Sequence, residues 1–563
     1  MEDYAESPIV ERVRWVIGSL FVLALILAIQ LVRWQLVARS QVIVAPAPTP
    51  ARPADAPRGA IVDRRGYLFA TDDFRWEVYA SPKRINDRPG RAAEMAATLA
   101  PYLRQSEADL LAQLSSDADA VLLERNANLI TVQAIAEKKY DPRLLWVDAV
   151  RERFYPQAGL GAHLIGFVNS SRSGFYGVEG FYDPFLRLGT VPLDLQRYPS
   201  QEFTPNLHLP SPAGHDLVLT IDRAAQFIVE EELRKGIIEY GSESGTIIVL
   251  DPRTGAILAM ASYPAYNPNQ RYAADEPYFI DPAIGSVYEP GSAFKVITIA
   301  SALDAGAVTP QTRVEDTAKM IVGGREIKNL EEKGYGMVTI TEILARSLNV
   351  GAAKIAQEMG KEAFYAAVRR FGFGAPTGVD LDGEVSGLIK LPGEAQWSES
   401  ELATNAFGQG VAVTPLQLAV AVAAIANEGQ MMRPHVAEAL VVKGRLIPIP
   451  PFPVRQVIRP ETARTFTKIL LEATEQAAGG PLVPGYHFAG KTGTAEIPGQ
   501  GAYLADLTKV TFVGYGPVED PRFVILVKYD KPKKSHMAQH VALPVFKRVA
   551  QRLVALMDIP PEK

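Results

Sequence analysis

The chain has 563 residues, of which 47% are hydrophobic and 21% charged, a composition that excludes a disordered protein. Its length exceeds what one hydrophobic core supports, so we expect two or three folded parts. The net charge of -5, with Lys531, Lys533 and Lys534 as the densest basic run, argues against nucleic acid as a partner. The lack of cysteine excludes disulfides, thiolate chemistry and Cys-ligated zinc.

The N-terminal region contains an apolar stretch from Trp15 to Val32 in which only Ser19 and Gln30 are polar. At about 1.5 Å per residue it spans roughly 27 Å of hydrocarbon, which predicts a transmembrane helix near residues 15–34, within a segment 1–39 that begins with a short tail. A cleaved signal peptide is the alternative, but Arg33 and Trp34 follow where small residues should lead to a cleavage site. Arginines flank the stretch on both sides, so their count does not orient the helix.

The next two segments differ in composition. Residues 40–57 are dense in proline and alanine and predict an extended linker. Residues 58–205 combine a strand-like piece at Trp76–Ala80 with a helical pattern between Arg91 and Leu114, and they contain no catalytic signature.

From residue 206 to residue 563 the pattern is that of a sheet covered by helices. A helix capped by Asp222 and ending at Tyr240 is expected. Its apolar face is expected to contain Ala225, Val229, Leu233 and Ile237. Two apolar runs around the turn at 251–255 predict a β-hairpin, and residues 510–516 and 522–529 predict a second strand pair that a helix at 541–557 can cover. The fold class is therefore α/β or α+β, with layers of helices on a sheet.

The first candidate catalytic motif is Glu289-Pro-Gly-Ser-Ala-Phe-Lys295. Pro290 and Gly291 break the chain, so Ser292 should begin a helix with Lys295 one turn later on the same face. A lysine whose pKa is lowered by burial can take the proton of a serine hydroxyl. An isolated Ser-x-x-Lys occurs by chance, so this motif needs support.

Two further motifs supply that support. Ser347-Leu-Asn349 follows a capping box at Thr339–Glu342 and should lie at the end of that short helix or in the next turn. Lys491-Thr492-Gly493-Thr494 reads as a strand beside a cleft, where Gly493 would let a substrate backbone approach and the Thr494 N–H would be a donor. A phosphate-binding lysine is the alternative, but the Gly-x-x-x-x-Gly-Lys-Ser/Thr motif is absent.

Taken together and in this order, the three motifs resemble those of the penicillin-binding proteins. The resemblance to class B covers nearly everything after the linker and rests on further stretches: Arg58–Gly66 (RGAIVDRRG), Arg153–Pro156 (RFYP), Ala162–Gly166 (AHLIG), Gly177–Gly180 (GVEG), Tyr266–Asn269 (YNPN), Gly408–Gly410 (GQG) and Val413–Leu416 (VTPL). The Glu-Asp-x-x-Phe-x-x-His signature of class A glycosyltransferases is absent. The motif wording favours division-type, septal enzymes over elongation-type ones.

This resemblance implies a penicillin-binding-protein transpeptidase fold at 206–563, an antiparallel sheet flanked by helices, preceded by an elongated, dimerisation-like pedestal at 58–205. It implies a D,D-transpeptidase that forms a serine acyl-enzyme with peptidoglycan stem peptides ending in D-Ala-D-Ala, cross-links them, and is inhibited covalently by β-lactams. Ser292 would be the nucleophile, Lys295 its base and Ser347 the proton relay. The groups that hold the donor peptide would be Asn349, Lys491, Thr492, Gly493 and Thr494. No cofactor and no metal are implied.

The resemblance also places the protein in the inner (plasma) membrane through a single helix, with a cytoplasmic N-terminus and an extracytoplasmic catalytic part. A multi-pass lipid II polymerase and divisome or elongasome proteins are the expected partners. Division versus elongation duty, the acceptor chemistry and the oligomeric state stay open.

Two departures from the family pattern are present. His536 and His540 stand where relatives usually have small residues; a metal site is one interpretation, but a plain loop pair is favoured because no third ligand is nearby. Glu401-Leu-Ala-Thr-Asn405 resembles the deacylating motif of class A β-lactamases, yet it leads into Gly408-Gln-Gly410, which favours a structural role.

Three alternatives to a transpeptidase follow from the same motifs. A D,D-carboxypeptidase or β-lactamase would use water instead of an acceptor amine. A non-catalytic β-lactam sensor would need a cytoplasmic output, for which roughly 14 residues leave little room. A scaffold with vestigial motifs is disfavoured because every motif residue is present.

Overall fold

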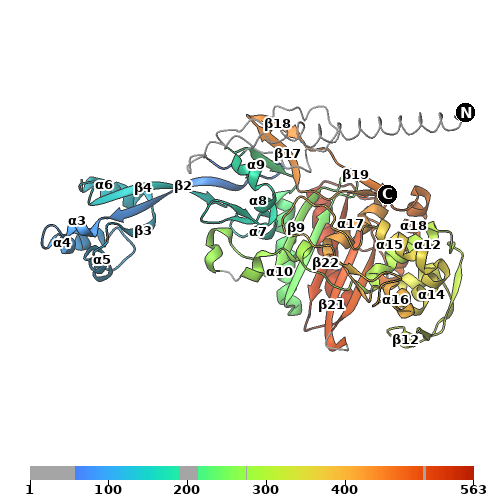
Figure 1. Cartoon of the computed structure of the whole chain (residues 1–563). Coiled ribbons are helices and arrows are strands. Elements are labelled where there is room, and N and C mark those ends of the chain that lie inside the picture. Colours follow the sequence, from blue (N-terminus) through green and yellow to red (C-terminus); the bar gives the residue numbers. More distant parts are fainter. Residues whose placement is uncertain (1–56, 189–213, 274–275, 499–502, 563) are drawn as a thin grey trace, which may run out of the picture. The chain divides into compact units, whose positions relative to one another are not determined.

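The computed structural model describes residues 57–188, 214–273, 276–498 and 503–562 (Figure 1). The transmembrane helix expected near residues 15–34, the linker and the expected boundary near 205 lie outside these ranges. Within them, no helix is long and apolar enough to cross a membrane.

Residues 57–188 combine short helices with four strands of a seven-stranded sheet, whose other three strands come from residues 216–219, 437–442 and 445–448. The elements are β1 (Ile61–Val62), β2 (Leu68–Ala80), α3 (Pro82–Ile85), α4 (Arg91–Leu99), α5 (Glu107–Leu114), β3 (Val121–Ala127), α6 (Leu129–Glu137), β4 (Leu145–Phe154), α7 (Ala162–Ile165), β5 (Phe167–Val168), β6 (Gly174–Phe175), α8 (Gly177–Phe181) and α9 (Asp183–Leu188). The long strand β2 pairs antiparallel with both β3 and β4. One face of these three strands packs on α4, α5 and α6 in a core that includes Val78, Leu99 and Leu114.

The strand expected at Trp76–Ala80 is the end of β2. The helical pattern expected between residues 91 and 114 is confirmed, and it forms two helices, α4 and α5. Pro101 follows the C-cap of α4 and cannot continue a helix, and Ser106 accepts the backbone N–H of Asp109 to start α5.

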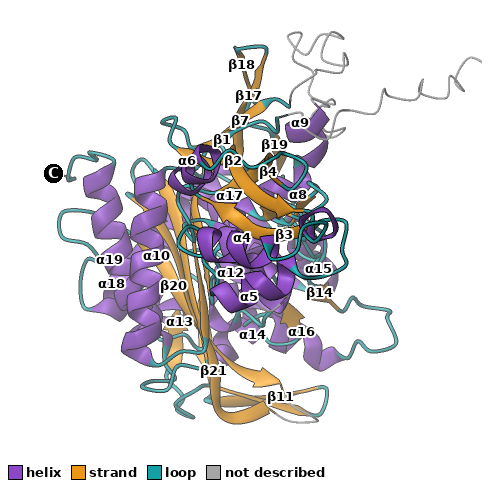
Figure 2. Cartoon of the chain, turned by 90° about the vertical axis from the view of Figure 1, so that its left-hand side faces the viewer, coloured by secondary structure: helices purple, strands orange, loops and turns teal. Residues whose placement is uncertain are grey.

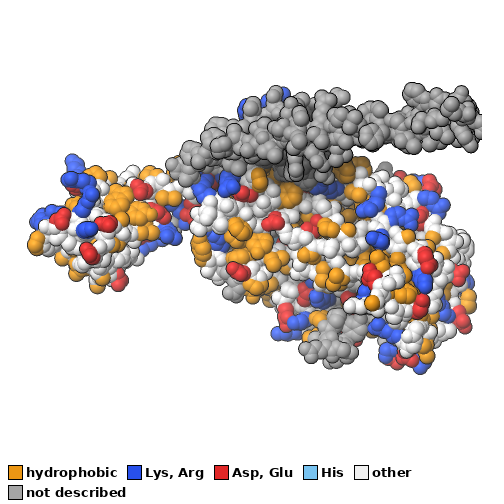
Figure 3. Space-filling model, in the orientation of Figure 1, with side chains coloured by type: hydrophobic (Ala, Val, Ile, Leu, Met, Phe, Trp, Pro, Cys, Tyr) orange, Lys and Arg blue, Asp and Glu red, His pale blue; other side chains and the backbone are white. Residues whose placement is uncertain are grey.

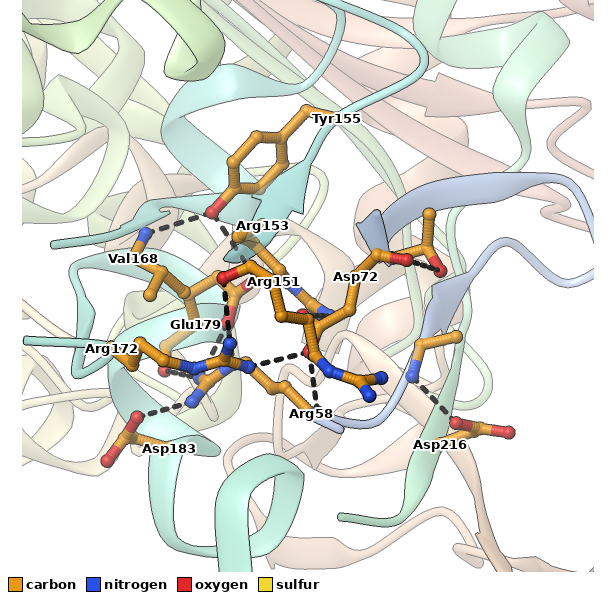
Figure 4. A network of polar contacts seen from close by, with 12 residues as sticks. Arg58, Asp72, Arg151, Arg153, Tyr155, Val168, Arg172, Glu179, Asp183 and Asp216 are labelled. Carbon is orange, nitrogen blue, oxygen red and sulfur yellow. Dashed lines mark hydrogen bonds and ion pairs between the residues drawn. The ribbon is translucent and has the colours of Figure 1, made fainter. Parts of the chain in front are cut away.

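A buried ionic network ties the start of the described chain to the helices that follow β4 (Figure 4). Arg58 contacts Glu179 at 2.6 Å and Asp183 at 2.6 Å, while Arg153 donates to the other Glu179 oxygen at 2.7 Å. Asp72 accepts the backbone N–H of Arg58 at 2.9 Å. Glu179 is fully buried between two guanidinium groups, and together they hold its pKa below the ordinary value although burial alone would raise it. Four stretches distant in sequence are therefore fixed together by charge.

Residues 214–562 contain the five-stranded central sheet, the helices around it, and the three remaining strands of the seven-stranded sheet, β7, β17 and β18. The strands are β7 (Asp216–Leu219), β8 (Ser244–Leu250), β9 (Ile257–Tyr263), β10 (Arg313–Asp316), β11 (Lys319–Val322), β12 (Arg325–Lys328), β13 (Gly336–Thr339), β14 (Leu388–Ile389), β15 (Val411–Ala412), β16 (Gln430–Met432), β17 (Ala437–Val442), β18 (Arg445–Pro448), β19 (Pro453–Gln456), β20 (Ala489–Pro498), β21 (Tyr503–Gly516) and β22 (Phe523–Asp530). The α-helices are α10 (Arg223–Tyr240), α11 (Pro282–Gly285), α12 (Lys295–Asp304), α13 (Ile340–Ala345), α14 (Asn349–Met359), α15 (Lys361–Arg370), α16 (Glu399–Asn405), α17 (Pro415–Ala426), α18 (Pro460–Ala478) and α19 (Ala538–Leu556). Three 3₁₀ turns are η4 (Pro268–Ala273), η5 (Glu276–Phe279) and η6 (Gly291–Phe294).

The central sheet has five antiparallel strands in the order β20-β21-β22-β8-β9. Helices α10 and α19 cover one face, and α17, with α12 beyond it, lies on the other (Figure 2). Because successive residues of β8 point to opposite faces, Ile247 and Val249 belong to the core under α10 and α19, and Ile248 and Leu250 to the core around α17. The predicted hairpin, the second strand pair and the covering helix are confirmed.

Helix α10 also forms as predicted. Asp222 accepts the backbone N–H groups of Ala224 and Ala225 as N-cap, and Gly241 ends the helix in the left-handed conformation at φ 65°. The four residues expected on its apolar face are all buried in the core with α19, namely Ala225, Val229, Leu233 and Ile237. The mixed α/β layer architecture inferred from the sequence is therefore correct.

Candidate active site

Ser292 lies in the 3₁₀ turn η6, immediately before α12. The expected helix start is thus a tighter turn, and α12 itself begins at Lys295. Gly291 has φ 55° and its N–H donates to the carbonyl of Gly408 at 3.2 Å. A Cβ on Gly408 would lie 2.2 Å from the Gly291 oxygen, so the Gly408-Gln-Gly410 stretch fits closely against the serine turn.

Nζ of Lys295 is the centre of the hydrogen bonds around Ser292. It lies 3.1 Å from Oγ of Ser292, 2.6 Å from the carbonyl oxygen of Ser347, 3.3 Å from Oγ of Ser347 and 2.8 Å from Oδ1 of Asn349. The residue is fully buried. A neutral amine in this position can accept the Ser292 proton.

Burial first, and the nearby positive charge of Lys491 second, hold the pKa of Lys295 well below that of an ordinary lysine. The carboxylate of Asp316 acts in the opposite direction. The net effect favours the neutral amine, which is the form that a general base requires.

Ser347 lies in the turn between α13 and α14, which is the second of the two positions predicted from the sequence. The predicted capping box at Thr339 and Glu342 is present. Its φ is 58°, a left-handed conformation that non-glycine residues rarely adopt and that costs on the order of 1 kcal/mol. This turn aims the Ser347 carbonyl at Nζ of Lys295 and brings Oγ to 3.1 Å from Nζ of Lys491. The hydroxyl therefore stands between two amines.

Lys491 is buried on β20, the edge strand of the sheet. Its Nζ also donates to the carbonyl oxygen and Oγ1 of Thr492, both at 3.2 Å. Burial lowers its pKa to about 7. An anionic group that entered the cleft would favour the protonated form.

Gly493 lies directly against the serine turn. A Cβ there would lie 2.4 Å from the Pro290 oxygen and 3.0 Å from Cβ of Ala293, so the packing of this turn requires a glycine, and the expected approach of a substrate backbone stays a prediction. Thr494, one residue further, accepts the backbone N–H of Ala538 at the start of α19 with its Oγ1 at 3.1 Å. β20, η6 and α19 are thus joined at this point.

These groups line one cleft of about 700 Å³. Its lining includes Ser292, Ser347, Asn349, Lys491, Thr492 and Thr494. The three motifs, which are far apart in the chain, meet there. The arrangement offers a nucleophilic hydroxyl, a buried amine to deprotonate it and a second amine that can bind an anion.

Sequence reasoning missed two buried residues at this cleft, Asn329 in its lining and Asp316, which does not line it. Asp316 and Asn329 are each 2% exposed and hydrogen-bonded to each other, and Asn329 also contacts the start of α14. Neither residue lies in a recognisable motif, and only their unexpected burial reveals them.

The two departures from the family pattern fall at the edge of the site or outside it. His536 is exposed at the cleft and His540 lies on α19 with Nδ1 3.3 Å from Oγ of Ser535. In the described ranges no group of three or more His, Cys, Asp or Glu could hold a metal. Glu401 on α16 accepts from Lys390 at 3.0 Å and does not line the cleft, in keeping with a structural role.

Comparison with known families agrees with this geometry. Residues 245–551 match the penicillin binding protein transpeptidase domain, and residues 53–187 match the penicillin-binding protein dimerisation domain. Together the two models cover most of the chain.

Individual relatives match over nearly the same length. The chain is 32% identical to peptidoglycan D,D-transpeptidase FtsI of Escherichia coli K12, over 90% of this chain and 84% of the relative. It is 30% identical to stage V sporulation protein D of Bacillus subtilis, over 91% and 80%. Among solved structures, penicillin binding protein 3 of Mycobacterium tuberculosis, complexed with ampicillin, superposes with a TM-score of 0.68 at 26% identity, covering 90% of this chain and 96% of that one. The chain therefore belongs to the class B penicillin-binding proteins, the peptidoglycan D,D-transpeptidases.

Proposed function

We propose that the cleft carries out cross-linking through a serine acyl-enzyme. Oγ of Ser292 attacks the penultimate carbonyl carbon of a stem peptide ending in D-Ala-D-Ala, and Nζ of Lys295 takes the hydroxyl proton. The C–N bond to the terminal D-Ala breaks, and its amine leaves with a proton passed on by Ser347. An amine of a second stem peptide then attacks the ester, releases Ser292 and completes the cross-link.

The remaining motif residues hold the donor peptide. Lys491, with Thr492 and Thr494, binds the terminal carboxylate, and Asn349 fixes the peptide through its side chain. Backbone N–H groups of Ser292 and Thr494 stabilise the oxyanion of the tetrahedral intermediate, a contribution of about 3 to 4 kcal/mol per donor in acyl-transfer enzymes. β-Lactams acylate Ser292 in the same way, because their strained amide occupies the place of the D-Ala-D-Ala bond.

The observation that carries this proposal is the 3.1 Å contact between Nζ of the fully buried Lys295 and Oγ of Ser292, which lines the cleft. An ordinary lysine is protonated at neutral pH and cannot act as a base. Burial and the positive charge of Lys491 lower the pKa of Lys295, and this favours the neutral amine that can take the proton of Ser292.

Labelling with a fluorescent penicillin tests the nucleophile. Ser292→Ala is expected to abolish covalent labelling of the full chain in detergent, whereas Ser398→Ala, an exposed serine outside the cleft, should label normally. The labelling rate of the unmodified chain should rise with pH through the lowered pKa of Lys295, because only the neutral amine accepts a proton. Labelling of Ser292→Ala would place the nucleophile elsewhere.

Product analysis separates the transpeptidase from its enzymatic alternatives. With a donor pentapeptide and an acceptor amine, a transpeptidase yields a cross-linked dimer, whereas a D,D-carboxypeptidase yields the tetrapeptide. Slow release of bound penicillin, over many minutes, would exclude a β-lactamase. A sensor or a scaffold would form no product from the pentapeptide at all.

We further propose that the chain is held in the inner membrane by one helix near residues 15–34, with the catalytic part outside the cytoplasm, and that it acts in division. Its similarity to FtsI supports the division assignment. The expected partners are a multi-pass lipid II polymerase and other divisome proteins. A fluorescent fusion should localise to the septum, and signal only along the lateral wall would contradict the division role.

On the face shown in Figure 3, basic and acidic side chains are interspersed with apolar ones, with no large field of one sign to recruit nucleic acid.

A further inference from the structure

A buried polar pair lies behind the Ser347 turn. Asp316 ends β10, and Asn329 follows β12 directly. Nδ2 of Asn329 donates to the two carboxylate oxygens of Asp316 at 2.8 and 2.9 Å, and the backbone N–H of Tyr335 donates to the second oxygen at 3.1 Å. These donors to the buried carboxylate are all neutral, and the burial of a charge without a charged hydrogen-bond partner costs free energy. Such a cost suggests that the pair has a role.

The other end of Asn329 contacts the start of α14. Its Oδ1 accepts the backbone N–H of Asn349 at 2.8 Å and that of Val350 at 3.1 Å. The N-cap residue Leu348 has no side chain able to accept these hydrogens. Asn329 therefore supplies from a distant segment the acceptor that a capping serine or aspartate would provide.

Asn349 continues the chain of contacts into the cleft. Its Oδ1 accepts from Nζ of Lys295 at 2.8 Å, and its Nδ2 donates to the carbonyl of Lys328, the residue before Asn329. We propose that Asp316 and Asn329 are positioning residues for the reaction, which hold the start of α14 so that Asn349 and the Ser347 turn stay within hydrogen-bond distance of Lys295. This inference rests on the proposed role of Lys295.

The charge of Asp316 gives the pair a second effect. The charged groups that act on Lys295 are Lys491 from β20, which lowers its pKa, and Asp316 from β10, which raises it. The groups that contact Nζ from η6, from the Ser347 turn and from α14 are neutral: Ser292, Ser347 and Asn349. Removing the carboxylate should lower the pKa of Lys295 further and extend acylation to lower pH.

Three variants of the full chain test this with the rate of acylation by a fluorescent penicillin measured across pH. Asp316→Asn removes the charge and turns one acceptor into a donor that faces another donor. We expect a loss of roughly tenfold to a hundredfold at neutral pH, as for other buried hydrogen-bond partners of active-site groups. The pH at which the remaining activity appears should move down.

Asn329→Asp should give the opposite pH response. Two carboxylates at 2.8 Å cannot both ionise in a buried site, so one of them keeps a proton at low pH and can donate to the other. As pH rises through the raised pKa of that pair, the proton is lost and the two charges repel each other. Acylation should therefore fall at high pH, where the unmodified chain is active.

The exchange of both residues, Asp316→Asn with Asn329→Asp, restores one carboxylate and one amide. It should recover at least half of the loss on a logarithmic scale, because the amide introduced on β10 can donate to the carboxylate introduced after β12. One side-chain oxygen then remains for the backbone N–H of Tyr335 and another for the start of α14. A purely structural pair would also be rescued by the exchange, but it would not produce the opposite pH shifts of the two single variants.

Controls keep the outcomes distinct. Asp380→Asn alters another buried carboxylate, which binds Tyr182 and the backbone N–H groups of Val436 and Ala437, and should lower thermal stability without moving the pH profile of acylation. If the single variants and the exchange all lose activity equally at every pH, or fail to fold while Asp380→Asn folds, the positioning proposal is wrong. If Ser292→Ala still labels, the proposed function itself fails, whatever the pair does.

Discussion

The clearest physical prediction concerns Lys491, whose replacement by methionine should make the protein more stable at neutral pH and less active. Lys491 is 5% exposed, and its contacts are with the neutral groups of Ser347 and Thr492. Methionine has a similar length and can fill the same space. The variant therefore removes a buried charge with little change of shape.

The magnitude follows from the pKa, which burial lowers from 10.5 to about 7. That difference corresponds to about 5 kcal/mol of preference for the neutral form in the folded protein. The unfolded chain binds this proton more tightly, so the cost to stability is fully present below pH 7 and disappears above about pH 10.5. The lost hydrogen bonds, at about 1 kcal/mol each, offset roughly 3 kcal/mol. At pH 7 the variant should gain about 1 to 2 kcal/mol.

The sign should reverse at high pH, where this lysine is neutral in the folded protein and loses its proton in the unfolded chain as well. Only the lost hydrogen bonds then remain, so the variant should be less stable than the unmodified chain by about 1 to 3 kcal/mol near pH 10.5. Thermal unfolding of the full chain in detergent at pH 6.5, 8.5 and 10.5 measures the difference. Penicillin acylation, measured in parallel at neutral pH, should be strongly reduced.

Lys528→Met is the matched control on the same sheet. Lys528 is also 5% exposed, but its Nζ contacts both oxygens of Asp530 at 2.7 and 2.6 Å. Its removal leaves a buried carboxylate with fewer partners, so stability at pH 7 should fall instead of rise. The reasoning about Lys491 is refuted if Lys491→Met is destabilising at pH 6.5, or if its stability difference does not change with pH.

Two further changes test the close fit of the serine turn and the buried ionic network around Glu179. Gly493→Ala should reduce acylation at least tenfold and lower the melting temperature, because its Cβ would lie 2.4 Å from the Pro290 oxygen and push the Ser292 turn away; an unchanged labelling rate would contradict this close fit. Glu179→Gln should destabilise the chain by about 3 to 5 kcal/mol in urea unfolding, because it leaves Arg58 and Arg153 without their shared carboxylate, whereas Asp141→Asn, in an exposed pair with Arg143, should have no measurable effect.

The sequence alone determined the features that depend on near neighbours in the chain. The 3.6-residue period of residues 222–240 specified the buried face of α10, and the apolar runs around residues 251–255 specified a hairpin of the central sheet. Ser292 and Lys295 are three positions apart, so their proximity follows from one helical turn. The helical pattern at residues 91–114 forms two helices, because the proline at position 101 follows the end of the first one.

Only the tertiary structure decided the chemistry of these groups. The pKa of Lys295 depends on burial and on Lys491, which comes from a distant part of the chain, and the reason for Gly493 is the approach of Pro290 from another segment. The left-handed Ser347 and the buried pair of Asp316 and Asn329 are equally invisible in a local pattern. Burial and electrostatic interaction are summed over all segments that surround a side chain, so no window of the sequence contains them.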